Sequence, residues 1–304
     1  MDVIAVINKA TGMTSHDVVA RVRRLAGQRR VGHAGTLDPN ATGVLPVLLG
    51  QATRIAEYLS ESGKAYRATI RFGVETTTYD GEGDITRETP VHLTLEQIER
   101  ALPKFLGEQD QLPPIYSAIK RGGVPLYALA RAGAEVEVSP RRVRIDDLKV
   151  IAWSSPDLTL DVECGKGTYI RSLAHDLGQR LGPGAHLAGL VRTRSGPFTL
   201  SQAITLEELD AALTNGSWRY RLFAADEALL DWRAAILGEE NNARLRTGQS
   251  IRFARRSATP PPIDDELIRA YSTDGRFLGI MRWNGADQEW RPHKTLAIEP
   301  ELDA

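Results

Sequence analysis

The most informative segment of this chain reads His33-Ala34-Gly35-Thr36-Leu37-Asp38-Pro39 and continues as Ala41-Thr42-Gly43-Val44-Leu45-Pro46. Glycine and proline recur too often over residues 28–43 for a helix or a strand, so we predict a structured loop there. The proline after Asp38 keeps the backbone of that residue extended, and loops on a rigid scaffold carry a disproportionate share of catalytic groups. Asp38 is therefore a candidate reactive carboxylate. The alternative is that it caps a turn, as aspartate before proline commonly does.

A helix is predicted immediately before this loop, from Ser15 to Gly27. Its apolar residues fall on one face and its arginines lie outside that face, which is typical of an amphipathic helix. The apolar face holds Val18, Val19, Val22, Leu25 and Ala26, and the arginines are Arg21, Arg23 and Arg24. Thr14 or Ser15 can cap the start of the helix, and Gly27 can end it.

Two later segments alternate between apolar and polar residues, which predicts half-buried strands. The apolar positions are Tyr66, Ala68, Ile70 and Phe72 in the first strand, and Leu158, Leu160 and Val162 in the second. Two further pairs have the spacing of a helix capping box, Thr94 with Gln97 and Thr205 with Glu208. We expect the helix after Thr94 to bury Leu95, Ile98, Ala101 and Leu102.

The second strand ends in a glycine-rich turn, Cys164-Gly165-Lys166-Gly167-Thr168-Tyr169-Ile170-Arg171. We expect Thr168 to cap a helix whose apolar stripe is Ile170, Leu173, Ala174, Leu177 and Leu181. The free N–H groups at such a helix start can hold an anion. The turn is not a phosphate-binding P-loop, because glycine stands where serine or threonine must follow Gly-Lys. No dinucleotide-binding glycine fingerprint occurs around Gly182-Pro183-Gly184 either.

The chain is long enough, at 304 residues, for two domains. Helices mixed with non-consecutive strands favour an α+β fold for the first part. After about Leu237 the pattern changes to short segments such as Ile268–Tyr271, Phe277–Trp283 and Thr295–Ile298, which predict a small β-barrel. We therefore divide the chain into residues 1–236 and 237–304.

The charge is nearly balanced, with 38 Lys+Arg against 39 Asp+Glu. This balance argues against a histone-like or tail-type nucleic-acid binder but not against a folded enzyme that acts on RNA or DNA. Residues 16–54, 119–144 and 164–194 each carry a net charge of +4. If these three basic windows converge in space, they form a groove that tracks phosphates; the alternative is three separate solvated faces.

The remaining composition indicates a soluble cytoplasmic protein without a metal site. A lone cysteine, Cys164, ends an apolar strand, where a buried and unreactive role is the default. The six histidines show no paired spacing on a helix face. We expect no signal peptide and no membrane helix, because no apolar run approaches the necessary length.

Several further blocks now become informative: Lys9-Ala10-Thr11-Gly12-Met13-Thr14-Ser15, Lys64-Ala65-Tyr66, Pro113-Pro114-Ile115-Tyr116-Ser117-Ala118-Ile119-Lys120 and Leu190-Val191-Arg192-Thr193-Arg194-Ser195-Gly196-Pro197-Phe198. Together with the Asp38 loop and the glycine-rich turn, and in the same order along the chain, they resemble the TruB-type tRNA pseudouridine synthases. The blocks span residues 7–198. The chain departs from the family pattern at Ala10, Gly165 and Thr77, none of which removes a reacting group. The region after Leu237 resembles a PUA-like RNA-binding module through Phe277-Leu278-Gly279-Ile280.

The resemblance implies an α+β catalytic domain with a mixed or antiparallel sheet, followed by the PUA-like barrel. It also implies an isomerase that converts the uridine at position 55, in the T-loop of tRNA, to pseudouridine by base flipping. Because the reaction gains no atoms and transfers no electrons overall, no cofactor is expected. The implied partner is the T-stem-loop of tRNA, with no membrane, no obligatory protein or guide RNA, and a monomeric enzyme.

By the same resemblance, Asp38 is the essential carboxylate, Arg171 its buried ion-pair partner and Tyr66 a group beside the target base. Whether Asp38 attacks as a nucleophile or removes a proton from the sugar stays open. His33 is implied to fill the gap left by the flipped base. The other implied substrate-binding residues are Tyr169, Leu190, Lys9, Asp80, Lys120, Lys166 and Arg192.

Other functions remain as alternatives at this point. An RNA chaperone would fold tRNA without chemistry, and a guide-dependent relative would act on ribosomal RNA. A glycosidase fits less well, because no second carboxylate accompanies Asp38 in a recognisable acid motif.

Overall fold

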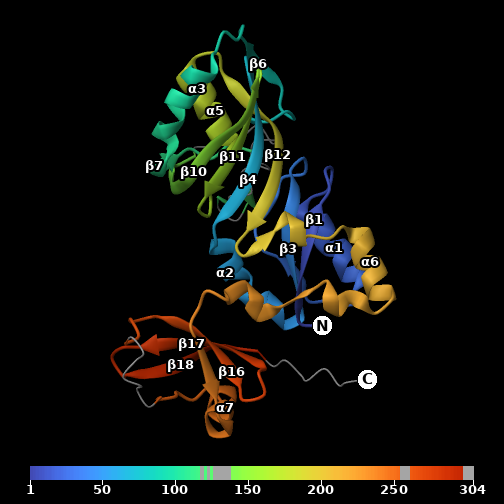
Figure 1. Ribbon diagram of the computed structural model, residues 1–304, viewed down its shortest axis with the longest axis vertical. Helices are drawn as coiled ribbons and strands as arrows, with labels where there is room; N and C mark the ends of the chain where they lie inside the picture. The colour runs from blue at the N-terminus through green and yellow to red at the C-terminus, as the bar shows by residue number, and fades with distance from the viewer. Residues whose placement is uncertain (117–119, 122–123, 126–137, 254–260, 297–304) are drawn as a thin grey trace.

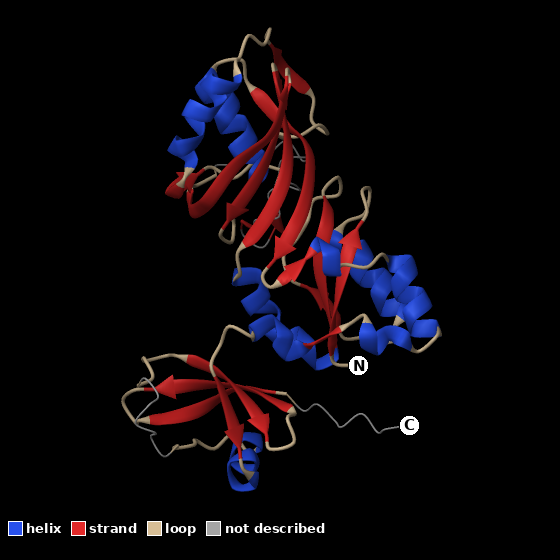
Figure 2. Ribbon diagram, in the orientation of Figure 1, coloured by secondary structure: helices blue, strands red, loops and turns tan. Residues whose placement is uncertain are grey.

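The computed structural model describes residues 1–116, 120–121, 124–125, 138–253 and 261–296 of the chain. Within these residues, ten strands form one large mixed sheet (Figures 1 and 2). The main path of the sheet runs through β14 (Phe223–Ala224), β1 (Val3–Lys9), β3 (Thr42–Leu49), β12 (Ala185–Ser195), β4 (Lys64–Phe72), β11 (Asp157–Cys164), β10 (Arg141–Ser154) and β7 (Gly107–Gln111). Two short strands pair off this path, β2 (Val31–His33) with β3 and β13 (Phe198–Thr199) with β12. The predicted α+β class is confirmed.

The two halves of the sheet meet where β12 runs parallel to β3. This contact has two residue pairs, Val191 with Thr42 and Arg192 with Gly43, whereas the other described pairings of the sheet are antiparallel. Gly43 has a φ of +97°, and a Cβ at this position would lie 2.3 Å from the carbonyl oxygen of Arg192. The close approach of the two strands therefore requires glycine.

Helices cover each half of the sheet. α1 (Ser15–Leu25) and α6 (Leu206–Thr214) lie beside the half that contains β1 and β3 (Figure 1). α3 (Leu95–Ala101) and α5 (Ile170–Leu181) cover the other half. The remaining short helices are α2 (Ala56–Glu61), α7 (Glu239–Arg246), η1 (Gly50–Ile55), η2 (Leu102–Phe105), η3 (Leu200–Gln202), η4 (Ser217–Tyr220) and η5 (Ala225–Leu229). The remaining short strands are β5 (Val74–Thr76), β6 (Ile85–Glu88), β8 (Lys120–Arg121) and β9 (Val124–Pro125).

The predicted helix starts are largely confirmed. Thr14 caps α1 in a capping box with Asp17, and both predicted boxes, at Thr94 and Thr205, are present. The expected burial of Leu95 is wrong: it is 39 % exposed, because its position in the first turn faces away from the core.

The cap predicted at Thr168 is also wrong. α5 begins after Tyr169, which makes no side-chain cap. The Thr168 hydroxyl instead donates to the carbonyl of Gly165 at 3.1 Å and closes the glycine-rich turn. This turn brings the start of α5 close to the first residues of β4, a strand whose burial alternates as predicted.

The C-terminal strands form a separate four-stranded sheet in the order β15 (Ala234–Leu237), β16 (Leu267–Ser272), β17 (Phe277–Asn284) and β18 (Glu289–Thr295). Among the described residues this sheet is open, so the expected closed barrel is not seen. β15 already belongs to it. β18 ends at Thr295 and so shares only that residue with the segment expected at Thr295–Ile298. Residues 297–298 lie outside the described part.

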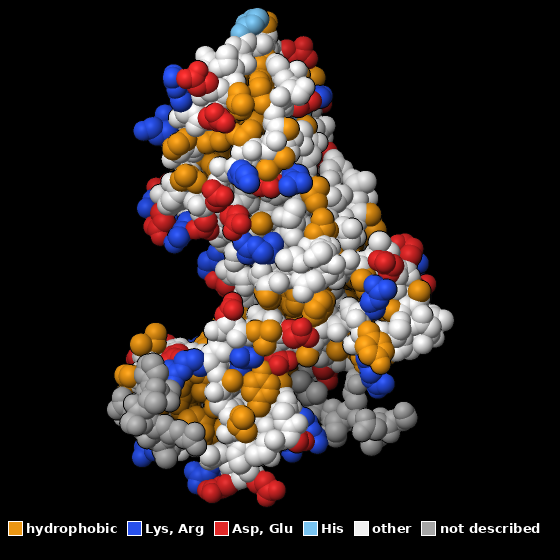
Figure 3. All heavy atoms as spheres, in the orientation of Figure 1, with side chains coloured by type: hydrophobic (Ala, Val, Ile, Leu, Met, Phe, Trp, Pro, Cys, Tyr) orange, Lys and Arg blue, Asp and Glu red, His pale blue; other side chains and the backbone are white. Residues whose placement is uncertain are grey.

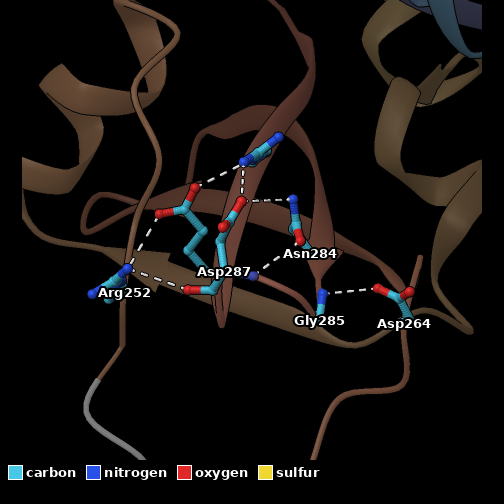
Figure 4. A network of polar contacts seen from close by, with 7 residues as sticks. Arg252, Asp264, Asn284, Gly285 and Asp287 are labelled. Atoms are coloured by element: carbon cyan, nitrogen blue, oxygen red, sulfur yellow. Dashed lines mark hydrogen bonds and ion pairs between the residues drawn. The ribbon is translucent and has the colours of Figure 1, made fainter.

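A polar network closes the turn between β17 and β18 (Figure 4). The Asn284 amide donates to the Asp287 carboxylate at 3.1 Å, and Arg252 donates to the Asp287 carbonyl at 3.2 Å. In the same turn, the Gly285 N–H donates at 2.8 Å to Oδ1 of Asp264, which lies shortly before β16. These bonds fix the hairpin end that lies away from the large sheet.

The other side of the C-terminal sheet shares a hydrophobic core with the large sheet. Phe277, Ile280 and Leu296 pack in one cluster with residues of β1, β3, α2 and their neighbours, including Ile4 and Leu48. A second set of contacts surrounds Lys294. Its Nζ lies 2.7 Å from Glu57 Oε1, donates to the Arg54 carbonyl at 2.9 Å and lies 5.4 Å from the centre of the Tyr58 ring. The two sheets are therefore packed together rather than merely tethered.

Candidate active site

A cavity of about 250 Å³ opens where the β2–β3 loop, β4, β12 and the start of α5 meet. It is lined by Gly35, Thr36, Leu37, Asp38, Ser60, Lys64, Tyr66, Gly165, Gly167, Thr168, Tyr169, Ile170, Arg171, Leu190 and Arg192. The cavity thus collects residues from four separate segments of the chain. Six of the predicted site residues line it, namely Asp38, Tyr66, Tyr169, Arg171, Leu190 and Arg192.

Asp38 and Arg171 are in contact on the wall of this cavity. Arg171 Nε lies 3.0 Å from Asp38 Oδ2, with the arginine side chain 7 % exposed and the aspartate 45 % exposed. The contact is an ion pair rather than a directed hydrogen bond, because the Nε–H has no hydrogen-bond partner of suitable geometry. One carboxylate oxygen of Asp38 is left to face the cavity.

Arg171 contacts a second carboxylate on its other side. Its Nη1 lies 3.4 Å from Asp80 Oδ2 and 3.3 Å from the Thr78 carbonyl, to which it donates. The other oxygen of Asp80 accepts from the Thr78 hydroxyl at 2.5 Å and from the Glu82 N–H at 3.0 Å. Asp80, predicted as a substrate-binding residue, therefore lies behind Arg171 and holds the guanidinium in place. Its substrate-binding role stays a prediction.

The loop that carries Asp38 is anchored from below. Lys9 is 1 % exposed, and its Nζ donates to the carbonyls of Ala10, Met13 and Pro39 at 2.9, 2.6 and 2.9 Å. Burial lowers the pKa of Lys9, and the nearby Asp38 opposes this shift. Because all three hydrogen bonds go to backbone carbonyls, Lys9 stabilises the conformation of the loop. Its predicted contact with substrate is not tested.

Arg192 braces the same loop from the sheet. Its side chain is 1 % exposed; Nε donates to the Val44 carbonyl at 2.7 Å, and Nη2 and Nη1 donate to the carbonyls of Gly35 and Thr36 at 3.0 and 3.4 Å. The guanidinium thus fixes the loop immediately before Asp38.

Lys64 lies beside Arg192 at the floor of the cavity. It is 6 % exposed and its Nζ donates to the carbonyls of Leu59, Ser60 and Ser62, which end α2. Burial, with a further contribution from Arg192, lowers the pKa of Lys64 to about 8. Sequence reasoning did not assign Lys64 to the site, although its spacing of two from Tyr66 on a strand places both on one face.

Tyr66 and Tyr169 supply the aromatic surface of the cavity. Tyr66 is buried on β4, directly opposite Arg192 on β12, and burial raises the pKa of its phenol. The backbone of Tyr169 is fixed by Gln111, whose amide accepts from the Tyr169 N–H at 2.8 Å and donates to its carbonyl at 3.1 Å. A planar ring entering the cavity would meet these side chains and Leu190.

His33 lies at the start of the loop and not in the cavity lining. Its ring contacts His16 edge-on at a centroid distance of 5.3 Å, and its Nδ1 is buried without a hydrogen-bond partner. Burial, followed by the charges of His16 and Arg192, lowers the pKa of His33 to about 4. The imidazole is therefore neutral at ordinary pH.

Residues of two basic windows, 16–54 and 164–194, line the cavity, but much of the charge of the described windows is compensated. The Gly165 N–H donates to the Arg144 carbonyl at 2.9 Å, which joins two of the windows. Lys166 is exposed and pairs with Glu61, and Arg144 and Arg194 pair with acidic neighbours. On the face in Figure 3, basic and acidic side chains are interspersed. Lys120 lies in β8, and its side chain falls outside the described part of the chain.

Within the described residues, no three side chains of His, Cys, Asp or Glu gather closely enough to hold a metal ion. No helix in that part of the chain is long and apolar enough to span a membrane. The cavity instead offers a carboxylate held by arginine, two phenols and buried cations. This set can remove a proton, attack an electrophilic carbon or stabilise developing charge.

Comparison with known sequences gives a consistent result. Residues 23–170 match the model of the TruB family pseudouridylate synthase N-terminal domain, and residues 171–231 match the tRNA pseudouridylate synthase B C-terminal domain. A tRNA pseudouridine synthase B of Dehalococcoides mccartyi is 45 % identical over 97 % of both chains. Proteins of the same name from Syntrophotalea carbinolica and Burkholderia mallei are 51 % and 42 % identical, over 82 % and 93 % of this chain and 81 % and 93 % of their own.

Solved structures share the fold. A chain from a Cbf5–Nop10–Gar1 complex superposes with a TM-score of 0.70 at 26 % identity, over 92 % of this chain and 78 % of that chain. A chain from an H/ACA RNP bound to a substrate RNA has a TM-score of 0.73 at 22 % identity, over 98 % and 86 %.

Proposed function

The chain belongs to the TruB family of pseudouridylate synthases, and on this premise we propose that it isomerises the uridine at position 55, in the T-loop of tRNA, to pseudouridine. The observation that carries the proposal is the ion pair of Asp38 with Arg171 on the wall of a cavity lined by Tyr66 and Tyr169. The curated relatives, named for activity on tRNA, support the choice of substrate.

Asp38 carries the chemistry in this proposal. The C1′–N1 bond breaks with its electron pair on the base, the base turns, and C5 bonds to C1′. C5 then loses its proton and N1 gains one, so that atoms and electrons balance. The half-exposed carboxylate can assist either by bonding to the sugar or by removing a sugar proton. Arg171, held by Asp80, orients it for either role.

The uridine must leave the T-loop stack to reach the cavity, at a cost of a few kcal/mol. Tyr66, Tyr169 and Leu190 line the space that would receive it. We assign His33 to the vacated stack, where an aromatic ring offsets about 1–3 kcal/mol. Its lowered pKa supports this role, because a neutral ring stacks without the cost of removing a charge from water.

The proposed function also assigns a role to each of the two parts of the chain. We propose residues 1–236 as the catalytic domain and 237–304 as a PUA-like module that extends the contact with the tRNA. The enzyme would act as a monomer on the bare T-stem-loop. This distinguishes it from the Cbf5–Nop10–Gar1 complex and the RNA-bound H/ACA RNP named above.

The proposal is tested by mapping pseudouridine in an unmodified T-stem-loop after incubation with the purified protein alone. We expect conversion of one uridine, and a loss of at least about 1,000-fold in rate for Asp38→Asn. Asp84→Asn, on an exposed turn, is the matched control and should retain activity. Thermal unfolding of each variant checks that the fold persists.

Full activity in a folded Asp38→Asn variant would contradict the proposed chemistry. Conversion that requires an added guide RNA or protein would instead place the chain with guide-dependent enzymes. Refolding of tRNA that survives without any conversion would indicate a chaperone.

A further inference from the structure

Two of the cations that line the cavity lack a carboxylate partner. Lys64 and Arg192 are 6 % and 1 % exposed, and the N–H groups of each donate to three backbone carbonyls. Neither forms an ion pair with any described acidic residue. Arg171 differs, because it lies between Asp38 and Asp80.

The two cations lie side by side. A Cβ placed on Gly35 would be 3.4 Å from Arg192 Nη1 and 3.7 Å from Lys64 Cε, so both side chains reach the same point under the loop. They also come from paired strands, since Lys64 lies opposite Ser195 and Arg192 opposite Tyr66. The floor of the cavity therefore carries two adjacent positive charges.

Burying a charge without an opposite charge is costly, and carbonyl dipoles offset only part of that cost. Two such groups placed together also repel each other. Arrangements of this kind are typical of sites where a negative charge arrives or develops during function.

We infer that Lys64 and Arg192 stabilise the negative charge of the uracil ring during the interval in which it is detached from the ribose. This inference rests on the proposed isomerisation. When the C1′–N1 bond breaks, its electron pair moves onto N1 and spreads to the ring oxygens. The charge disappears when C5 bonds to C1′, and the later loss of the C5 proton is matched by the gain of a proton at N1. The two cations therefore stabilise the transition state more than they stabilise the bound, neutral uridine.

A second source of negative charge has to be distinguished. The phosphates that flank the flipped nucleotide are charged before, during and after the reaction, so cations that served them would change affinity. Cations that serve the detached base would change the rate of the chemical step. The two effects separate in single-turnover measurements at saturating enzyme.

The test compares wild type, Lys64→Met and Lys64→Arg on T-stem-loops that carry uridine or 5-fluorouridine at the target position. The quantity measured is the rate at which the C1′–N1 bond breaks. Fluorine makes the ring a better leaving group, so it needs less help from the protein. We expect Lys64→Met to slow uridine by about 100-fold and 5-fluorouridine by less than about 10-fold, with RNA affinity unchanged. Lys64→Arg keeps the charge and should recover most of the uridine rate.

Lys9→Met is the matched control, because Lys9 is equally buried and also donates three bonds to carbonyls but does not line the cavity. A purely structural defect should slow both substrates by the same factor, as we expect for Lys9→Met. The inference is wrong if Lys64→Met does the same, or if it weakens RNA binding with an unchanged single-turnover rate. Failure of the wild type to convert uridine would overturn the proposed function instead.

Discussion

At the residue scale, the imidazole of His33 gives the clearest pH dependence. Its pKa falls from 6.5 to about 4 on folding because the ring is removed from water. Between these two values the unfolded chain binds a proton that the folded chain does not, so stability decreases as the pH falls from about 6.5 to about 4. Allowing for partial exposure, we expect this residue to contribute a loss of about 1 to 3 kcal/mol over that interval.

The measurement is urea unfolding at a series of pH values for wild type and His33→Gln. The variant should lose much of the decrease in the free energy of unfolding below pH 6.5. His92→Gln is the control, because His92 is an exposed histidine. Parallel pH profiles for wild type and His33→Gln would show that His33 binds its proton equally in both states.

Individual residues also show which parts of the site could be predicted from the sequence. The motif placed Asp38, Arg171 and Tyr66 in one site, and the structure brings them to one cavity. It did not reveal that Asp80 backs Arg171, since that contact depends on how a turn more than forty residues after Asp38 folds over α5. Nor did it assign Lys64, because a lysine in an alternating strand is normally read as the exposed edge of the pattern.

At the scale of elements, the joint between β3 and β12 is the position most sensitive to a single methyl group. Gly43→Ala adds a Cβ that would overlap the Arg192 backbone, at a φ that alanine rarely adopts. We expect a loss of more than about 3 kcal/mol in the free energy of unfolding, together with loss of activity, because β3 follows the Asp38 loop directly.

Gly12→Ala provides the control for this prediction. Gly12 also has a positive φ, +81°, but no atom lies within 4 Å of an added Cβ. Its substitution should cost only the backbone strain, about 1 to 2 kcal/mol. Equal losses for the two variants in denaturant titrations would mean that the contact with β12 adds nothing.

The sequence predicted elements well where the interacting residues are close together in the sequence. The capping boxes at Thr94 and Thr205 join residues three apart and are present. The predicted helix cap at Thr168 is wrong, because the Thr168 hydroxyl donates to the nearby carbonyl of Gly165 in the glycine-rich turn. The parallel contact of β12 with β3 joins segments about 150 residues apart and has no local signal.

At the scale of the whole molecule, Lys294 connects the C-terminal sheet to α2 and η1. Lys294→Met removes the ion pair with Glu57, the bond to the Arg54 carbonyl and the contact with the Tyr58 ring. We expect a loss of about 1 to 2 kcal/mol, because the lysine side chain is only 21 % exposed. Lys104→Met, at an exposed position, should change the free energy of unfolding by less than about 0.5 kcal/mol.

The shared hydrophobic cluster predicts that the lower stability of Lys294→Met is seen in a single unfolding transition. Because Phe277 and Ile280 pack with residues of the large sheet, both sheets should unfold in one transition in wild type and in Lys294→Met. Calorimetry checks this expectation. A separate early transition in the wild type would show that the C-terminal sheet is an independent unit.

The order of strands also has a consequence for synthesis on the ribosome. β1 pairs on one side with β3 and on the other with β14, whose residues Phe223 and Ala224 leave the ribosome long after Val3 and Ile4. At about 5–20 residues per second, the delay is roughly 10 to 45 seconds. During this time one edge of the first, strongly apolar strand of the nascent chain lacks its partner strand, so this strand depends on a much later segment, or on a chaperone, to avoid aggregation.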